Sequence, residues 1–425
     1  MFRTATTASL VQYIESDYSR ITDLGVIIQG DAASDTKLFV INTTNGTVIN
    51  NFTLTLINPS TSDPSYGVGY FNFTDTALVV YAEDATDDSD IAIRLVYGNG
   101  TIGAETILNY NQSISGRTGD SNIFRVKFRP NITVNETAIS WYGDGAGEDY
   151  YGLMIYDKEN GHRYNWTSGN ETRNLDSTAG DFYDTAWTSD GNYLFMIVSN
   201  DTAGTAQDTT SVYIYNRTVG SFGEMDARPF NVSTKLDTGS ITSVKACTLR
   251  GRNDAVIFIE QNDGADVGVG VVYLNGTIEA GNPTADGTTE RNSGGADISI
   301  NIGCYSEDSS DGDVVLFFVD ANNLGIDYVT YDPDLRGASA WSVSALESAA
   351  KTASIGADDL SVAFVTLCPQ GNCFMLNTID ILLQGQSGTF WNGTGFDLTK
   401  KTTLNGGMSD NGRKGAGFLF RGNLT

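Results

Sequence analysis

One unit of about 55 to 60 residues recurs along this chain, and it limits the possible folds more than any other feature. Each copy reads as a short apolar strand, a polar turn, a second strand rich in aromatic or β-branched residues, and an acidic Gly/Asp loop. A third strand ending in Tyr or Asn follows, and then a tight turn and a weaker fourth strand. The second strands of six clear copies begin near Leu24, Thr76, Thr137, Asn192, Asp254 and Asp313, and a degenerate seventh copy contains NCFMLNTID from Asn372.

Runs of Val, Ile, Phe and Tyr of strand length, separated by Gly, Asp and Asn turns, indicate an all-β fold. Four strands in each of seven units predict a β-propeller with seven four-stranded blades, in which each sheet packs face to face on its neighbours. The alternatives are a string of β-sandwiches, which need about 100 residues each, and a β-solenoid, whose repeats are shorter. We expect residues 1–425 to form one propeller domain.

The two ends of the chain offer one strand too many for seven blades. LVQYIESDY from Leu10 supplies a first strand for the first unit, whereas MSDNGRKGAGFLFRG from Met408 also reads as a first and second strand. We therefore expect residues 1–20 and 408–425 to be terminal strands. They would complete the ring, begin an eighth blade, or pair with a neighbouring molecule by strand addition.

Acceptor sequences for N-linked sugars are far more frequent than chance predicts. Asn-x-Ser/Thr occurs sixteen times, whereas the Asn and Ser/Thr content gives roughly six at random. N-glycosylation requires passage through a secretory route, so we predict an extracellular glycoprotein, secreted or at the cell surface. The acceptors are Asn42, Asn45, Asn51, Asn72, Asn99, Asn111, Asn131, Asn135, Asn165, Asn170, Asn200, Asn216, Asn231, Asn275, Asn392 and Asn423.

The acceptors are unevenly placed, both within the unit and along the chain. Asn-Gly suits a two-residue hairpin because both positions tolerate positive φ, but the turn does not require the Thr that follows. A propeller places equivalent turns on one face, so we expect a ring of sugars there. Thirteen acceptors precede residue 235 and none lies in 276–391. We therefore predict an interface in 276–391, with drift in a Thr-poorer region as the alternative. The acceptors at the predicted turn between the third and fourth strands are Asn45, Asn99, Asn216, Asn275 and Asn392.

The charge balance excludes one class of partner. With 25 Lys+Arg against 52 Asp+Glu, the net charge is −27, which excludes a nucleic-acid binder that works by neutralising phosphates. No window of 18 uninterrupted apolar residues predicts a membrane span.

Acidic loops follow the second strand in nearly every unit, for example Asp87, Asp88 and Asp90. Hard oxygen ligands suit calcium, but none of these loops matches the D-x-D-x-D-G pattern. We interpret the loops as a solvated acidic rim, with calcium binding as the weaker alternative. The sequence predicts no metal site and no cofactor other than covalently attached sugars.

Four cysteines in a secreted chain predict two disulfides, for which three connectivities exist. Cys247, Cys304 and Cys368 occupy equivalent positions in units five, six and seven. The spacing of Cys368 and Cys373 suits a staple across a hairpin loop, which leaves Cys247 and Cys304 to bridge adjacent blades.

Support for catalysis is weak. The one histidine, His162, lies in a Gly-rich turn with no partner nearby in sequence, so a Ser-His-Asp or His-metal mechanism lacks material. No pair of carboxylates stands out for glycoside hydrolysis. We therefore predict that the chain is not an enzyme and assign no catalytic residues.

The repeat core resembles a known family. The unit DVVLFFVDANNLGIDYVTYDPDLRGASAW, from Asp313, is similar to the repeats of fucose-binding propeller lectins of fungi and bacteria. This resemblance covers most of the chain, and it implies sugar binding between blades through Arg, Glu and Trp of adjacent units. We assign no binding residues, because the tryptophans do not recur at one repeat position. They are Trp141, Trp166, Trp187, Trp341 and Trp391.

Two functions remain. The first, our prediction, is a non-catalytic, heavily N-glycosylated extracellular structural or assembly protein, a subunit of a filament, coat or matrix. It would associate with itself through the acceptor-free region 276–391 or a terminal strand. The second is a lectin-like propeller that recognises a carbohydrate or a protein. Acceptor density and the doubled terminal strand favour the first.

Overall fold

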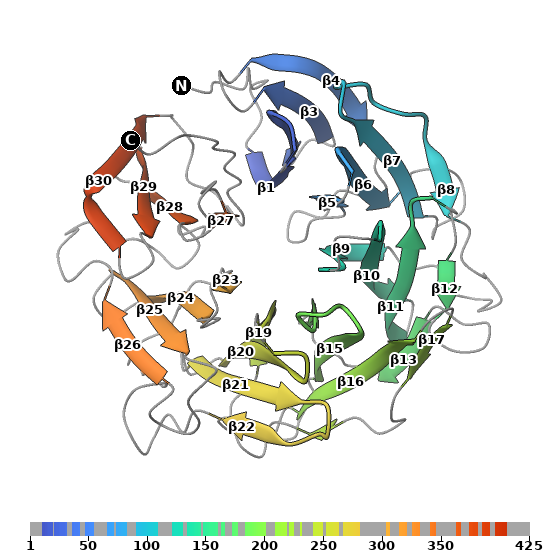
Figure 1. Cartoon of the computed structure of the whole chain (residues 1–425), viewed down its shortest axis with the longest axis vertical. Coiled ribbons are helices and arrows are strands. Elements are labelled where there is room, and N and C mark those ends of the chain that lie inside the picture. The colour runs from blue at the N-terminus through green and yellow to red at the C-terminus, as the bar shows by residue number, and fades with distance from the viewer. Residues whose placement is uncertain are drawn as a thin grey trace.

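The computed structural model is a ring of antiparallel β-sheets (Figure 1). Among the residues it describes, no helix has the length and apolar character needed to cross a membrane. The described residues are 11–19, 21–31, 36–42, 47–54, 66–71, 74–82, 91–108, 121–130, 134–145, 148–159, 163–165, 172–176, 183–200, 209–218, 221–224, 230–231, 241–249, 252–262, 267–280, 303–306, 314–320, 325–331, 341–345, 363–366, 374–380, 385–391 and 396–405.

Seven sheets form the ring in these residues, and each contains four strands that are consecutive in the chain. The first strand of each sheet lies near the centre and the fourth lies at the periphery (Figure 1). The all-β propeller predicted from the repeats is therefore confirmed.

Sheets one to four contain the first eighteen strands, and sheets three and four each have a fifth, short strand, β13 or β18, that pairs with the third strand of the sheet. Their bounds are β1 Val11–Tyr18, β2 Leu24–Asp31, β3 Thr36–Asn42, β4 Val48–Leu54, β5 Tyr66–Tyr70, β6 Thr76–Ala82, β7 Ile91–Tyr97, β8 Thr106–Leu108, β9 Ser121–Phe128, β10 Glu136–Gly145, β11 Glu148–Asp157, β12 Arg163–Asn165, β13 Thr172–Asp176, β14 Tyr183–Trp187, β15 Tyr193–Asn200, β16 Thr209–Thr218, β17 Ser221–Glu224 and β18 Phe230–Asn231.

Sheets five to seven continue the same pattern. Their strands are β19 Ile241–Thr248, β20 Ala255–Asn262, β21 Val267–Tyr273, β22 Ile278–Ala280, β23 Gly303–Ser306, β24 Val314–Asp320, β25 Gly325–Tyr331, β26 Trp341–Ala345, β27 Ala363–Thr366, β28 Phe374–Asp380, β29 Gly385–Trp391 and β30 Phe396–Asn405.

The N-terminal segment takes the place of an innermost strand. β1 forms most of the LVQYIESDY segment and pairs with β2, with Tyr18 opposite Gly25. The last described sheet is complete without it, because β27 to β30 are consecutive. Residues 408–425 lie outside the described residues, so their role in closing the ring remains a prediction.

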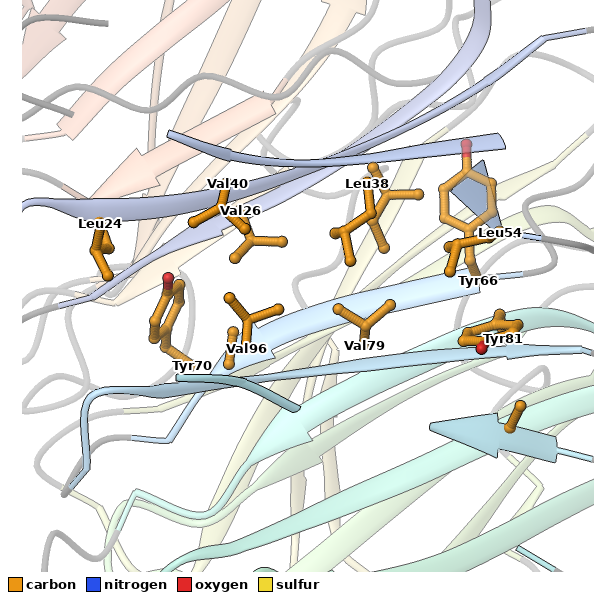
Figure 2. Close-up of a cluster of buried hydrophobic side chains, with 13 residues drawn as sticks. Leu24, Val26, Leu38, Val40, Leu54, Tyr66, Tyr70, Val79, Tyr81 and Val96 are labelled. Carbon is orange, nitrogen blue, oxygen red and sulfur yellow. The ribbon is translucent and has the colours of Figure 1, made fainter. Parts of the chain in front are cut away.

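Strands with unbroken apolar runs are buried on both faces. On β6, Val79 packs toward sheet one, while its neighbours Leu78 and Val80 pack toward sheet three. Side chains alternate between the two faces of a strand, so a run such as TALVVYA supplies two cores at once. Figure 2 shows the first of these cores, where Val26 and Val40 of sheet one face sheet two.

Two glycines on third strands make room for large aromatic side chains. Gly152 lies opposite Trp141 in the β10–β11 pair, and a Cβ added to it would lie 1.9 Å from Trp141 Cε2. Gly270 lies opposite Phe258, where an added Cβ would lie 2.6 Å from Phe258 Cζ. These two positions need glycine for space.

Candidate functional site

The connections after the first and third strands of a sheet lie side by side on one face of the ring. In sheet four, Arg217 N donates to Asn192 O at 2.7 Å, and in sheet five, Leu274 N donates to Asp254 O at 2.8 Å. We call this surface the turn face. The sequence predicted that it would carry acceptor asparagines.

Two predicted acceptors occupy matching turns on the turn face, at residues 97–101 and 273–277. In both turns the glycine after the asparagine has positive φ, 80° in the first and 77° in the second, a conformation that favours glycine. In both, the Oδ1 of Asn99 or Asn275 accepts from the threonine N–H at 2.9 Å. Both asparagines are exposed. The hydrogen bond uses Oδ1, whereas a sugar attaches to Nδ2 of the same exposed side chain.

Asn216 differs from its predicted position, since it lies inside β16 and pairs with Tyr193. The hairpin turn comes only after Thr218. Arg217 stands where the other turns have glycine, and a residue with a side chain does not readily adopt positive φ. Arg217 Nη2 also lies 2.6 Å from Glu136 Oε1, which holds this residue in the strand.

The other acceptors differ widely in exposure. Asn51 is exposed in the middle of β4, whereas Asn135 is 8% exposed and its Nδ2 donates to Glu159 Oε1 at 2.8 Å. Thr137, which completes the acceptor at Asn135, is fully buried, so the folded chain does not present that acceptor. Asn42, Asn165, Asn200 and Asn231 lie in strands β3, β12, β15 and β18, while Asn45, Asn72, Asn111, Asn131, Asn170, Asn392 and Asn423 lie outside the described residues.

A buried carboxylate connects the innermost strands of three consecutive sheets. The side chain of Asp184, on β14, is 2% exposed. Its Oδ1 lies 3.3 Å from Lys127 Nζ on β9, and its Oδ2 accepts from Ala246 N on β19 at 2.9 Å. Thr185 N also donates to Oδ1 at 2.9 Å. One side chain of sheet four thus bonds to sheets three and five near the centre of the ring.

The charges around Asp184 keep it ionised. Burial by itself would raise the pKa of Asp184. The positive charges of Lys127, Lys245 and Arg125 oppose that effect, and the hydrogen bond from the Ala246 N–H adds to them. The result is a pKa below the ordinary value for an aspartate, so the group acts as an ionic clamp at neutral pH.

Sequence reasoning missed this clamp. The available signal was a charged residue inside the first strand of each of three consecutive units: Arg125 and Lys127 in unit three, Asp184 in unit four and Lys245 in unit five. An ionised residue in a buried strand is rare unless it is paired.

A second buried ionic group joins sheets three and four at the turn face. Glu136 Oε2 lies 2.8 Å from Arg129 Nη1, and its Oε1 lies 2.6 Å from Arg217 Nη2. Arg129 Nε also donates to Gly191 O at 2.8 Å. Gly191 has φ of 68°, and a Cβ there would lie 2.7 Å from Arg129 Cγ. The close approach of the two sheets therefore depends on a glycine.

Cys247, on β19, is disulfide-bonded. β19 packs against β23, the innermost strand of sheet six, which contains Cys304. This placement suits the predicted bridge between adjacent blades. The Cys304 side chain, Cys368 and Cys373 lie outside the part of the chain described at side-chain level, so both pairings remain predictions.

Other predicted site residues play structural roles or lie outside the described residues. The acidic loop 83–90 and His162 are among the latter. Within the described ranges, no group of three His, Cys, Asp or Glu residues is placed to hold a metal ion. Trp141 and Trp187 are buried, and Trp187 Nε1 donates to Lys127 O at 2.8 Å. These two tryptophans therefore offer no exposed ring on which a sugar could stack.

Comparison with known proteins identifies the fold but no family. No family model matches the sequence, and no curated protein matches it. The chain is similar in structure to the BP39L lectin of Burkholderia pseudomallei, with a TM-score of 0.56 and 10% identity over 94% of this chain and 99% of that one.

Two further solved structures are similar to this chain at lower TM-scores. The β-propeller domain of the Trilobed protease of Pyrococcus furiosus matches with a TM-score of 0.47 and 8% identity, over 94% of this chain and 100% of that one. The periplasmic gluconolactonase PpgL of Pseudomonas aeruginosa matches with a TM-score of 0.49 and 10% identity, over 82% and 87%. Likenesses at these identities show the fold alone, and the fucose-binding type of lectin is not shown by them.

The prediction that this chain is not an enzyme is wrong, because the sequence provided no ground for excluding catalysis. Structures similar to it include an enzyme, the gluconolactonase. Function resides in sites built on a fold, and such sites combine residues that are distant in sequence, so a missing motif does not exclude catalysis. At 10% identity the similarity leaves this chain's own activity unshown.

Proposed function

We propose that this chain is an N-glycosylated extracellular structural protein, a subunit of a filament, coat or matrix that associates with copies of itself. The matching exposed acceptor turns at residues 97–101 and 273–277 carry the proposal, because both would place sugars on the turn face. The acceptor count, sixteen in 425 residues, supports it.

We infer the surface for self-association from the part of the chain that has no sugar acceptors. Residues 276–391 contain no acceptor and include all of sheet six together with β22, β27, β28 and β29. Bulky oligosaccharides keep surfaces apart, so close contact between copies is favoured on this part of the ring. The terminal segments 1–20 and 408–425 offer a second route, by strand addition.

Site-specific mass spectrometry of glycopeptides from the secreted protein tests the first half of the proposal. We expect sugars on Asn99 and Asn275 and none on Asn135, whose Nδ2 is engaged by Glu159. Unmodified Asn99 and Asn275 in secreted material would refute the proposal.

A new sugar in the acceptor-free region tests the second half. Ser342→Asn creates an acceptor with Val343 and Ser344 on β26, the outermost strand of sheet six. We expect it to abolish assemblies seen by negative-stain imaging of the parent protein. Ala104→Asn is the matched control, because with Thr106 it creates an acceptor at an exposed position in the connection that leads into β8 of sheet two. Isolated rings in native material, or equal effects of the two variants, would contradict the assembly role.

Recognition of a carbohydrate is the second candidate, and the likeness to the BP39L lectin favours it. Binding of the purified protein to a glycan array tests it. Specific binding that survives enzymatic removal of the protein's own sugars would support recognition, and an array without signal would reject it.

A further inference from the structure

β4 is the outer edge strand of sheet one and has an unusually apolar surface. Val48, Ile49 and Phe52 are 40%, 46% and 37% exposed, and they are three of the five large exposed hydrophobic residues among those whose side chains the structure describes. An edge strand presents unpaired backbone N–H and C=O groups, so an exposed apolar edge is a template for pairing with another chain. β4 is therefore a strand that needs protection from such pairing.

Contacts with sheet two hold one face of β4 in place. Asn50 Nδ2 donates to Gly100 O at 3.2 Å, and the guanidinium of Arg94 lies 4.2 Å from the centre of the Phe52 ring. The β3–β4 register shifts by one residue at Ile49, an irregularity that is common at sheet edges. These features anchor β4 on the side of sheet two. On the strand itself Asn51 N donates to Asn50 Oδ1 at 2.9 Å, and within the described residues β3 is the one strand that pairs with β4.

A predicted sugar acceptor lies in the middle of this edge. Asn51 and Thr53 are both exposed and, with Phe52 between them, form the acceptor sequence. Successive residues of a strand point to opposite faces. Asn51 therefore points away from the face on which Asn50 and Phe52 contact sheet two.

We propose that an N-linked sugar on Asn51 caps the edge of β4 and prevents this strand from pairing with β4 of a second copy. This inference rests on the proposed function, because it requires a glycosylated chain. Two copies of one strand can pair antiparallel about a two-fold axis, so no other partner is needed. Side chains directly opposite one another on the same face of two antiparallel strands have Cβ atoms only about 4.5 to 5.5 Å apart, so an oligosaccharide on Asn51 would overlap the side chains of a paired second copy.

The cap also supports assembly through other surfaces. An uncapped β4 would compete with contacts made by the acceptor-free region 276–391, since both would join copies of the same chain. A sugar at Asn51 removes the competing contact, which is a means of restricting association to the intended surface.

Removing single acceptors in the full secreted chain tests the cap. Thr53→Ala removes the acceptor and leaves Asn51 in place. Thr101→Ala is the matched control, because it removes the acceptor at Asn99, while the hydrogen bond from the residue 101 backbone N–H to Asn99 Oδ1 can persist. We expect Thr53→Ala to self-associate at about ten-fold lower concentration than Thr101→Ala in sedimentation velocity, a difference of about 1.4 kcal/mol. Hydrogen exchange should show new protection confined to β4.

Two further variants guard against indirect effects. Asn51→Gln removes the same sugar by another substitution and should behave as Thr53→Ala does. Val48→Lys, added to Thr53→Ala, places a charge on the edge and should restore the parent behaviour, since charged residues block edge pairing.

Each outcome of the test bears on a specific claim. If Asn51 carries a sugar and Thr53→Ala behaves as Thr101→Ala does, the cap is refuted and the proposed function stands. If Asn51 is unmodified while Asn99 and Asn275 are modified, the cap is again refuted alone. If all three are unmodified, both proposals fail.

Discussion

Asp184 bonds two neighbouring sheets with one carboxylate, and this side chain has a larger role than its isolated position in the sequence indicates. Its Oδ1 lies near Lys127 and its Oδ2 accepts from the Ala246 backbone. A buried ion pair contributes little compared with a well-packed apolar pair, but removing one partner is costly. Removing the carboxylate should therefore cost more stability than the intact ion pair contributes.

Asp184→Asn should lower the free energy of unfolding by about 3 to 5 kcal/mol, because it leaves buried positive charge without its partner. Denaturant unfolding measures this. Asp254→Asn is the control, since the Asp254 side chain is 52% exposed and pairs with Arg252 only two residues away; it should cost under about 1 kcal/mol. Equal costs for the two variants would show that the clamp is not important.

The same variant should change the acid limit of the fold. The folded-state pKa of Asp184 lies below its ordinary value, whereas an unfolded aspartate titrates near about 3.9. The stabilisation is therefore complete above the unfolded pKa and is lost as pH falls through the folded pKa. The difference in Tm between parent and Asp184→Asn should shrink as pH falls from about 5 to about 2. A constant difference across that range would contradict the assignment.

At the scale of strands, apolar runs and aromatic–glycine pairs determine how sheets stack. The sequence predicted the strands of β6 and β15 well, because a run of consecutive apolar residues of strand length is typical of burial on both faces. The pairing of Trp141 with Gly152 was not predicted. It depends on the β10–β11 register, and register is decided by contacts across the whole sheet.

Gly152→Ala should destabilise the protein by about 1 to 3 kcal/mol, since the added methyl group overlaps the buried indole of Trp141. Thermal or denaturant unfolding measures the cost. Trp141→Leu also destabilises by itself. The double variant should nevertheless lose less free energy of unfolding than the sum of the two single losses, because the smaller side chain leaves space for the methyl group. If the two losses of stability are strictly additive, overlap with Trp141 is not the reason that Gly152→Ala destabilises the protein.

At the scale of the whole ring, closure and covalent bridging depend on segments far apart in the chain. Cys247 is disulfide-bonded, and β19 packs on the strand that carries Cys304. A bridge between them would connect sheet five to sheet six. It would add a covalent link to the acceptor-free part of the ring.

Peptide mapping without reduction should find Cys247 joined to Cys304 and Cys368 joined to Cys373. Replacing Cys247 and Cys304 together by Ser should lower the free energy of unfolding by about 4 kcal/mol in the chain-entropy account of disulfide stabilisation. A disulfide between Cys368 and Cys373 closes a much shorter loop, so replacing both of these cysteines should lower the free energy of unfolding by less. Any other connectivity in the map would overturn the pairing.

The sequence by itself determined the repeat, the strands within it, the propeller class and the acceptor turns at Asn99 and Asn275. These features depend on local order: side-chain alternation along a strand and the positive φ that Asn-Gly permits. Only the tertiary structure decided that Asn135 is buried, that Asp184 bonds to three strands and that Asn51 lies on an exposed apolar edge. Burial, ion pairing and edge position depend on which distant segments pack together, and a one-dimensional pattern does not specify those contacts.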